Sequence, residues 1–159
     1  MLRTPIPMTP EGLKKLHEEL KHLKAVERPK NVADIEAARG MGDLSENAEY
    51  HAAKERQGML ARKIVELENK IVQAQVIDPA TLNHQKVVFG ATVKLTDTDT
   101  GEQVQYQIVG ADESDVKTGR ISVESPIAKS LIGKGPGETA KVVTPRGSRE
   151  FEILEIKYE

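Results

Sequence analysis

The sequence predicts an α+β fold in two parts: an N-terminal antiparallel α-helical coiled-coil hairpin and a C-terminal antiparallel sheet with one helix. Apolar residues recur at steps of three and four up to about residue 77, whereas short β-branched runs separated by turns follow from residue 86. Charged residues make up 30% of the chain and aromatic residues 3%, which suits a hairpin with much exposed surface. We therefore expect the hairpin over residues 1–77, a linker over 78–85 and the sheet domain over 86–159.

The first helix is expected to begin at Thr9, which is a good N-cap. Pro10 suits the first helical position, and Glu11 favours the positive end of the helix dipole. Pro29 lacks a backbone N–H and should bend or interrupt the helix. Between these points the leucines follow the spacing of a coiled-coil seam, at Leu13, Leu16, Leu20 and Leu23.

The apolar stripe resumes after Pro29, and Gly40 is placed to end the first helix. This stripe consists of Val32, Ile35 and Ala38. Beyond an acidic turn, a second helix carries a more regular seam, which consists of Tyr50, Ala53, Gln57, Leu60, Ile64, Leu67, Ile71 and Ala74. Two such helices joined by a short turn predict an antiparallel hairpin about 45 Å long. Packing of both helices on a globular core is the alternative, and the charged residues beside the narrow seam argue against it.

The C-terminal part has the alternation and turn residues of a sheet. Residues 86–95 and 103–110 flank the turn DTDTGE and predict a hairpin of two strands, and residues 120–124 predict a third strand. Residues 140–145 and 148–158 predict a closing hairpin around the turn PRG. The strands together predict a twisted antiparallel sheet.

One short helix is expected within this sheet domain, over the segment SPIAKSLIGK. Ser125 is the expected N-cap, Pro126 takes the first helical position, and Gly133 stands at the exit. We expect this helix to lie against the sheet.

Composition excludes several classes of protein. The net charge of −2 argues against wrapping on DNA or coating an anionic membrane. Cysteine is absent, which excludes disulfides and thiolate metal sites. The N-terminal residues lack the apolar core of a signal peptide, and no apolar run reaches membrane-spanning length. We therefore expect a cytoplasmic protein with no membrane partner.

The turn between the two helices, RGMGDLSENAEYH, carries three carboxylates. One interpretation is a capping box, in which Asp43 is the N-cap of the second helix and Glu46 reaches back to the backbone, while Glu49 favours the helix N-terminus. The other is that Asp43 and Glu46 hold a divalent cation, because Mg²⁺ takes oxygen ligands and often only one or two carboxylates. The spacing alone favours the capping box and leaves the cation site open.

No other part of the sequence supplies further metal ligands or a catalytic motif. The four histidines lack zinc spacing, and the chain has no glycine-rich phosphate loop, GxSxG sequence or cysteine nucleophile. If the turn does chemistry, it does so in a site built mostly by another molecule. Basic residues that could border a phosphate backbone are Arg39, Lys54 and Arg56. A solvated helix face with ordinary charge pairs is the alternative for these residues.

Three segments resemble bacterial transcript cleavage factors of the GreA/GreB family, GreA type. They are IPMTPEGLKKLHEELKHLK, GDLSENAEYHAAKERQ and ISVESPIAKSLIGK. The resemblance covers nearly the whole chain in colinear order and includes VVFGATVKL and YQIVG. The combination is specific, although no single segment would be, and it favours the chemical interpretation of the acidic turn.

The resemblance implies a coiled-coil hairpin and a C-terminal domain with an FKBP-like fold. It implies a transcription elongation factor that binds RNA polymerase, with the hairpin inserted through the secondary channel. Asp43 and Glu46 match the family's tip acids, which help to bind a second Mg²⁺ in the polymerase complex. Polymerase then cleaves the backtracked nascent RNA near its 3′ end. The resemblance also implies that the free protein has no cofactor and no small-molecule substrate, and is not itself an enzyme.

Two further groups of residues match the family's pattern. Ser125, Pro126 and Ile127 match the segment that contacts polymerase, and a plain helix start at Ser125 is compatible with that role. Glu49 and Tyr50 match tip positions, and we expect them to support the turn and the seam.

Three other functions stay open at this point. A non-cleaving secondary-channel regulator would inhibit polymerase with the same architecture, although here the Asp-Leu-Ser-Glu pattern is intact. A peptidyl-prolyl isomerase would share the FKBP-like fold, but fold does not carry function. A prolyl pocket normally has an aromatic lining, and the chain has only two Phe, three Tyr and no Trp. A coiled-coil adaptor without chemistry would tolerate substitutions in the turn.

Overall fold

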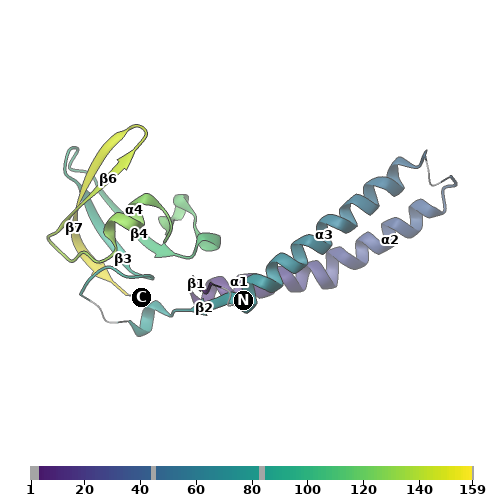
Figure 1. Ribbon diagram of the computed structural model, residues 1–159, viewed down its shortest axis with the longest axis horizontal. Coiled ribbons are helices and arrows are strands. Elements are labelled where there is room, and N and C mark those ends of the chain that lie inside the picture. The colour runs from purple at the N-terminus through teal and green to yellow at the C-terminus, as the bar shows by residue number, and fades with distance from the viewer. Residues whose placement is uncertain (1–3, 44–45, 83–84, 159) are drawn as a thin grey trace. The chain divides into compact units, whose positions relative to one another are not determined.

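The computed structural model describes residues 4–43, 46–82 and 85–158. The chain forms two compact units, Leu13–Ala74 and Pro5–Gly12 together with the described residues from 75 onward. The first unit is α-helical and the second contains the main sheet (Figure 1). Pro5–Gly12, which we expected within the hairpin, thus packs with the sheet domain.

The helical unit is a hairpin whose two arms lie side by side (Figure 1). The arms consist of α1 (Pro10–His22), a π-helical segment (Leu23–Glu27) and α2 (Arg28–Arg39), followed by α3 (Ala48–Gln73). The backbone N–H of Gly12 donates to Thr9 Oγ1 at 3.1 Å, which confirms Thr9 as the cap of α1. The predicted hairpin is confirmed. Among the described helices, none combines the length and apolar character needed to span a membrane.

Pro29 widens the first arm rather than interrupting it. In the π-helical segment the N–H of Arg28 donates to the carbonyl of Leu23, five residues back instead of four. Proline has no N–H for the carbonyl four residues before it, and its ring crowds that carbonyl. A wider turn just ahead of Pro29 accommodates both conflicts, so the helix continues through it.

The seam of α2 differs from the predicted one by a single residue. Ile35 and Ala38 are buried as predicted, but Val32 is 44% exposed and Asn31 is buried in its place at 2% exposure. Steps of four and three residues stay on one helix face, whereas two steps of three from Val32 drift by about 120° in total. Helix geometry therefore overrides the apolar character of Val32.

The seam of α3 agrees with the prediction over most of its length. Two positions differ. Gln57 is exposed, and its amide oxygen accepts a hydrogen bond from Lys54 Nζ at 2.8 Å. Ala74 lies beyond the last residue of α3, as its C-cap. The buried seam residues are Ala53, Leu60, Ile64 and Leu67.

The second unit contains a five-stranded sheet in the order β5-β4-β3-β7-β6, with helix α4 beside it (Figure 1). The elements are β3 (Thr92–Asp97), β4 (Gln103–Val109), β5 (Arg120–Ser122), α4 (Pro126–Leu131), β6 (Thr139–Thr144) and β7 (Gly147–Lys157). A separate two-stranded sheet pairs β1 (Ile6–Met8) with β2 (Ala74–Val76), and short 3₁₀ turns occupy Pro79–Thr81, Ala111–Glu113 and Val116–Thr118.

The five-stranded sheet is mixed, which corrects the prediction of a wholly antiparallel one. β3 pairs with β4 and β7, and β6 with β7, in the antiparallel sense, but β5 runs parallel to β4. The two 3₁₀ turns between β4 and β5 carry the chain back, so that Ile121 pairs with Ile108. Parallel neighbours need such a longer connection, whereas a tight turn would have reversed the strand.

The predicted helix and closing hairpin are confirmed. Ser125 Oγ accepts a hydrogen bond from the N–H of Ala128 at 3.2 Å, and Gly133 has a φ of +89° at the exit of α4. β6 and β7 pair around the turn with Thr144 opposite Gly147.

The hydrophobic core of this unit lies between α4 and the sheet. Ala128 and Leu131 of α4 are fully buried there. The other buried members of the core are Val87, Ala91, Val93, Leu95, Ile108, Ile121, Ala140, Val142, Phe151 and Ile153.

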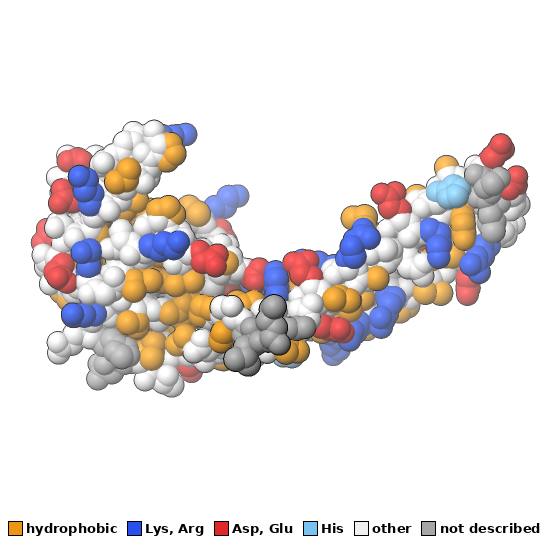
Figure 2. Space-filling model, viewed as in Figure 1, with side chains coloured by type: hydrophobic (Ala, Val, Ile, Leu, Met, Phe, Trp, Pro, Cys, Tyr) orange, Lys and Arg blue, Asp and Glu red, His pale blue; other side chains and the backbone are white. Residues whose placement is uncertain are grey.

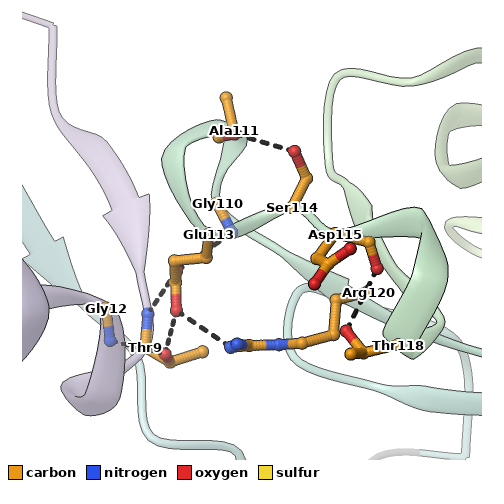
Figure 3. A network of polar contacts seen from close by, with 9 residues as sticks. All are labelled: Thr9, Gly12, Gly110, Ala111, Glu113, Ser114, Asp115, Thr118 and Arg120. Atoms are coloured by element: carbon orange, nitrogen blue, oxygen red, sulfur yellow. Dashed lines mark hydrogen bonds and ion pairs between the residues drawn. The ribbon is translucent and has the colours of Figure 1, made fainter.

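Glu113 fastens the segment Pro5–Gly12 to the rest of this unit (Figure 3). Its side chain is 4% exposed, and its carboxylate accepts hydrogen bonds from the N–H groups of Thr9 at 3.0 Å and Gly110 at 3.1 Å and from the Thr9 hydroxyl. Arg120 adds an ion pair with an N–O distance of 3.4 Å. One buried carboxylate thus satisfies donors from three parts of the chain.

Replacement of Glu113 should destabilise the sheet domain. We expect Glu113→Ala to lower the free energy of unfolding by about 3 kcal/mol, because a buried ion pair loses one partner and two backbone N–H groups lose their acceptor. Urea unfolding followed by circular dichroism measures this change. Glu155→Ala is the matched control, since Glu155 pairs with Lys157 at 3.8 Å where both are about half exposed, and no measurable change is expected. Equal losses in the two variants would contradict the role given to Glu113.

Asp97 and Arg149 predict a dependence of stability on pH. The Arg149 guanidinium, bonded to Asp97 at 2.9 Å, together with the N–H groups of Asp99 and Thr100, holds the pKa of Asp97 below its ordinary value of 3.8. The stabilisation is therefore present above about pH 4 and is lost as the pH falls through the folded-state pKa. The difference in urea midpoint between the wild type and Asp97→Asn should be larger at about pH 6 than at about pH 3. A difference that stays constant with pH would show that the pair does not act this way.

Candidate functional site at the hairpin tip

The hairpin turns where α2 ends. The N–H groups of Gly40 and Met41 donate to the carbonyls of Glu36 and Ala38 at 3.3 and 3.1 Å, so α2 ends near Gly40 as predicted. Gly42 has a φ of +113°, which glycine adopts readily and other residues rarely do. Leu44 and Ser45, which complete the predicted Asp-Leu-Ser-Glu pattern, lie outside the described residues.

Asn47 closes the turn by bonding to both helices. Its side-chain oxygen accepts a hydrogen bond from the N–H of Tyr50 at 3.0 Å, which makes it the N-cap of α3. Its side-chain nitrogen donates to the carbonyl of Ala38 at 2.7 Å, near the end of α2. One amide therefore satisfies an unpaired donor at the start of one helix and a carbonyl at the end of the other.

The capping-box interpretation of the turn is wrong for α3. That interpretation needs Asp43 as the N-cap, but α3 begins at Ala48 with Asn47 as its cap. Asparagine caps a helix as well as aspartate does, and its amide also donates across the hairpin, which a carboxylate cannot do. Asp43 and Glu46 both precede the cap and are solvent-exposed, while Glu49 lies in the first turn of α3 as predicted.

Aromatic side chains support the base of the turn. The guanidinium carbon of Arg39 lies 6.0 Å from the ring centroid of Tyr50, at the edge of the range for a cation–π contact. The Tyr50 and His51 rings meet edge to face with centroids 5.7 Å apart. Tyr50 thus contacts both the end of α2 and its own helix neighbour.

The three basic candidates do not form one patch. Arg39 is at the tip, whereas Lys54 borders a groove with Lys24 and Arg28, and Arg56 borders another with Arg62 and Lys63. Arg56 is also paired with Glu27 of the opposite arm at 2.7 Å, and this bond holds the pKa of Glu27 below its ordinary value. Lys54 and Arg56 therefore face different sides of the hairpin. Figure 2 shows basic and acidic side chains interleaved along its visible face.

The docking candidates lie at the first turn of α4. Ser125 is engaged in local structure, since its hydroxyl donates to the carbonyl of Ser122 at 2.7 Å and caps α4. Ile127 is partly buried against the core, and Pro126 is exposed. Of the three, Pro126 presents its side chain most fully to the surface.

Two exposed carboxylates on one turn suit a shared cation site. Within the part of the chain that the structure describes, no three His, Asp or Glu side chains gather into a group that could hold a metal ion. Mg²⁺ commonly takes one or two protein carboxylates and fills its other positions with water or phosphate oxygens. The donor set of Asp43 and Glu46 fits that preference.

Two asparagines that bond across the hairpin, Asn31 and Asn47, were not predicted from the sequence. Asn47 follows the acids as a strong N-cap candidate, and the competing pattern Asp-Leu-Ser-Glu obscured it. Asn31 gave no signal, because a polar residue beside Val32 suggests an exposed position.

The class of the protein follows from two family models. One, described as "Transcription elongation factor, N-terminal", matches residues 6–76, and the other, "Transcription elongation factor, GreA/GreB, C-term", matches residues 82–158. Together they cover the hairpin and the sheet domain. The chain belongs to the GreA/GreB family of transcription elongation factors.

Relatives identify the branch of the family as GreA. "Transcription elongation factor GreA" of Phenylobacterium zucineum is 56% identical over 153 residues, which cover 96% of this chain and 98% of that protein. The GreA protein of Alkalilimnicola ehrlichii is 55% identical over 154 residues, with the same coverage. The GreA type of elongation factor indicated by the sequence segments is thereby confirmed.

Two solved structures resemble the chain more distantly. Gfh1 of Thermus thermophilus is 24% identical with a TM-score of 0.43, covering 96% of this chain and 98% of that chain. A GreA/GreB factor from Nitrosomonas europaea is 18% identical with a TM-score of 0.43, covering 98% of this chain and 100% of that chain. At these TM-scores the two structures add nothing to the family assignment.

The cap of α3 can be tested by substitution. Asn47→Ala should lower the free energy of unfolding of the hairpin by about 1–2 kcal/mol, because the helix loses its N-cap and Ala38 loses a donor. Asp43→Ala and Glu46→Ala should leave helicity and the melting midpoint nearly unchanged. Thermal unfolding followed by far-ultraviolet circular dichroism compares the three variants. If Asp43→Ala destabilised the hairpin as much as Asn47→Ala does, the result would support the capping-box interpretation instead.

Proposed function

We propose that this chain binds RNA polymerase and stimulates hydrolysis of backtracked nascent RNA, with Asp43 and Glu46 as the active carboxylates of the tip. Membership of the family supports the partner. The observation that carries the proposal is the cap of α3: Asn47 begins the helix, so neither acid is needed as its N-cap.

The shape of the hairpin supports insertion into the secondary channel of polymerase. A helix of 26 residues such as α3 is about 39 Å long, and two packed helices form a narrow rod. In this proposal the rod carries the tip to the active centre, and the first turn of α4, around Ser125, Pro126 and Ile127, contacts the polymerase surface. Arg39 is the basic candidate nearest the nascent RNA, and Lys54 and Arg56 lie further along the rod.

The chemistry assigned to the chain is limited to what two carboxylates can do. A Mg²⁺ ion held jointly with polymerase would stabilise the charge that develops when a phosphodiester is hydrolysed. The carboxylates of Asp43 and Glu46 supply oxygen ligands, and either can accept a hydrogen bond from the attacking water and orient it. All other groups of the reaction belong to polymerase and RNA, so the free chain is an activator rather than an enzyme.

The proposal predicts a specific loss of cleavage. Asp43→Asn and Glu46→Gln keep the shape of each side chain and remove its charge, and each should slow stimulated cleavage by about 100-fold. The measurement is the release of 3′ fragments from labelled RNA in a halted, backtracked polymerase complex. Glu49→Gln is the matched control, because it removes an equal charge from an exposed acid in the first turn of α3. With this variant, stimulated cleavage should proceed at the wild-type rate.

Three results would count against the proposal. Wild-type rates in both tip variants would remove the acids from the chemistry. If Glu49→Gln slowed stimulated cleavage as much as the tip variants do, the total negative charge of the tip, rather than Asp43 and Glu46 specifically, would be responsible. Inhibited RNA synthesis without fragment release in the wild type would favour a non-cleaving regulator.

A further inference from the structure

We infer that Asn31 is a positioning residue, whose buried amide fixes the register of the two arms and thereby the place of the tip carboxylates. The consequence for cleavage rests on the proposed function. The register itself is a property of the free hairpin and can be measured without polymerase.

Asn31 is a buried polar residue in an otherwise apolar seam. Its side chain is 2% exposed, and its amide nitrogen donates to the backbone carbonyl of Ala53 on α3 at 2.9 Å. A buried amide adds less stability than an aliphatic side chain of similar size, but in coiled coils it selects one register. The small side chain of Ala53 lets the donor reach the backbone.

Asn47 makes the reciprocal bond at the tip. Asn31 of α2 donates to a carbonyl of α3, and Asn47, which caps α3, donates to the carbonyl of Ala38 in α2. Both acceptors are alanine carbonyls. The two bonds cross the seam in opposite directions, and both join the arms on the helical side of the turn that carries Asp43 and Glu46.

The arm needs its own register because the π-helical segment changes the seam. The leucine seam that begins in α1 ends at Leu23. If its alternating steps of four and three continued, the buried positions of α2 would be 30 and 34. The residues that are buried are Asn31 and Ile35, each one position later. The leucines of α1 thus do not determine which residues of α2 face α3. Aliphatic contacts are non-directional, whereas a hydrogen bond tolerates only a few tenths of an ångström.

A small shift of register would matter more for cleavage than for folding. One residue of slip moves a helix by about 1.5 Å along its axis. Reacting groups must be held to about 0.5 Å, and a misplacement of about 1 Å can cost a factor of about 100 in rate. A leucine at position 31 would preserve the apolar seam and lose this constraint.

The first experiment measures the register in the free protein. The chain has no cysteine, so nitroxide labels can be placed on thiols introduced at Ala37 and Ala52, which are exposed on the two arms. Double electron–electron resonance should give one narrow distance distribution for the wild-type background. Asn31→Leu should broaden this distribution or add a second distance. Val32→Leu is the control, because it introduces a leucine at the neighbouring, exposed position, and it should leave the distribution unchanged. An unchanged distribution in Asn31→Leu would overturn the inference.

The second experiment measures cleavage and stability together. In Asn31→Leu the maximal rate of stimulated cleavage should fall about tenfold, while the half-saturating protein concentration stays the same and the melting midpoint does not fall. Val32→Leu should match the wild type in all three measurements. A wild-type maximal rate, or a rate loss explained by a lower midpoint, would overturn the positioning role. Failure of the wild type to stimulate cleavage would instead overturn the proposed function, and the distance measurement would still decide the register.

Discussion

The seam between α2 and α3 is the constraint on which the hairpin depends. Each arm can bury one face only, and the buried residues there are mostly small or medium aliphatic side chains. Aliphatic contacts of this kind are non-directional, so they do not by themselves distinguish between alternative alignments of the two arms. The hydrogen bonds of Asn31 and Asn47 select one of them, because each joins a side chain of one arm to the backbone of the other.

The residues that stabilise the hairpin and the sheet domain differ from those proposed to act in cleavage. Asn47 performs the capping that α3 requires, and the aliphatic seam and the core beneath α4 provide the buried apolar surface. Asp43 and Glu46 precede the cap and remain exposed. An acidic turn can therefore carry chemistry without weakening the helix that it leads into.

Much of the fold could be predicted from the sequence, because periodicity and end signals act locally. Thr9, Ser125 and Gly133 mark helix ends through their own backbone and side-chain chemistry, and the structure agrees at all three. The errors came from competition between acceptable local patterns. Asp43 and Asn47 are both good caps, and the bond to Ala38, which favours Asn47, forms only in the folded hairpin.

The other errors have similar causes. The parallel pairing of β5 depends on how the connection after β4 folds, which no strand pattern reveals. The burial of Asn31 depends on the phase of a helix that passes through a π-helical segment. The network around Glu113 joins residues more than a hundred positions apart in the chain. The place of Asp43 and Glu46 on the turn was predictable, and their role remains a prediction that rests on the family and on their exposure.

If Asp43 and Glu46 complete a Mg²⁺ site together with polymerase, the factor should change how transcript hydrolysis depends on Mg²⁺. The most direct measurement is the initial rate of transcript hydrolysis in backtracked complexes as a function of Mg²⁺ concentration, with no factor, with the wild type, and with a variant that carries both Asp43→Asn and Glu46→Gln. We predict that the wild type lowers the half-saturating Mg²⁺ concentration and that the double variant leaves it at the value of polymerase alone. An equally low value with the double variant would contradict the account.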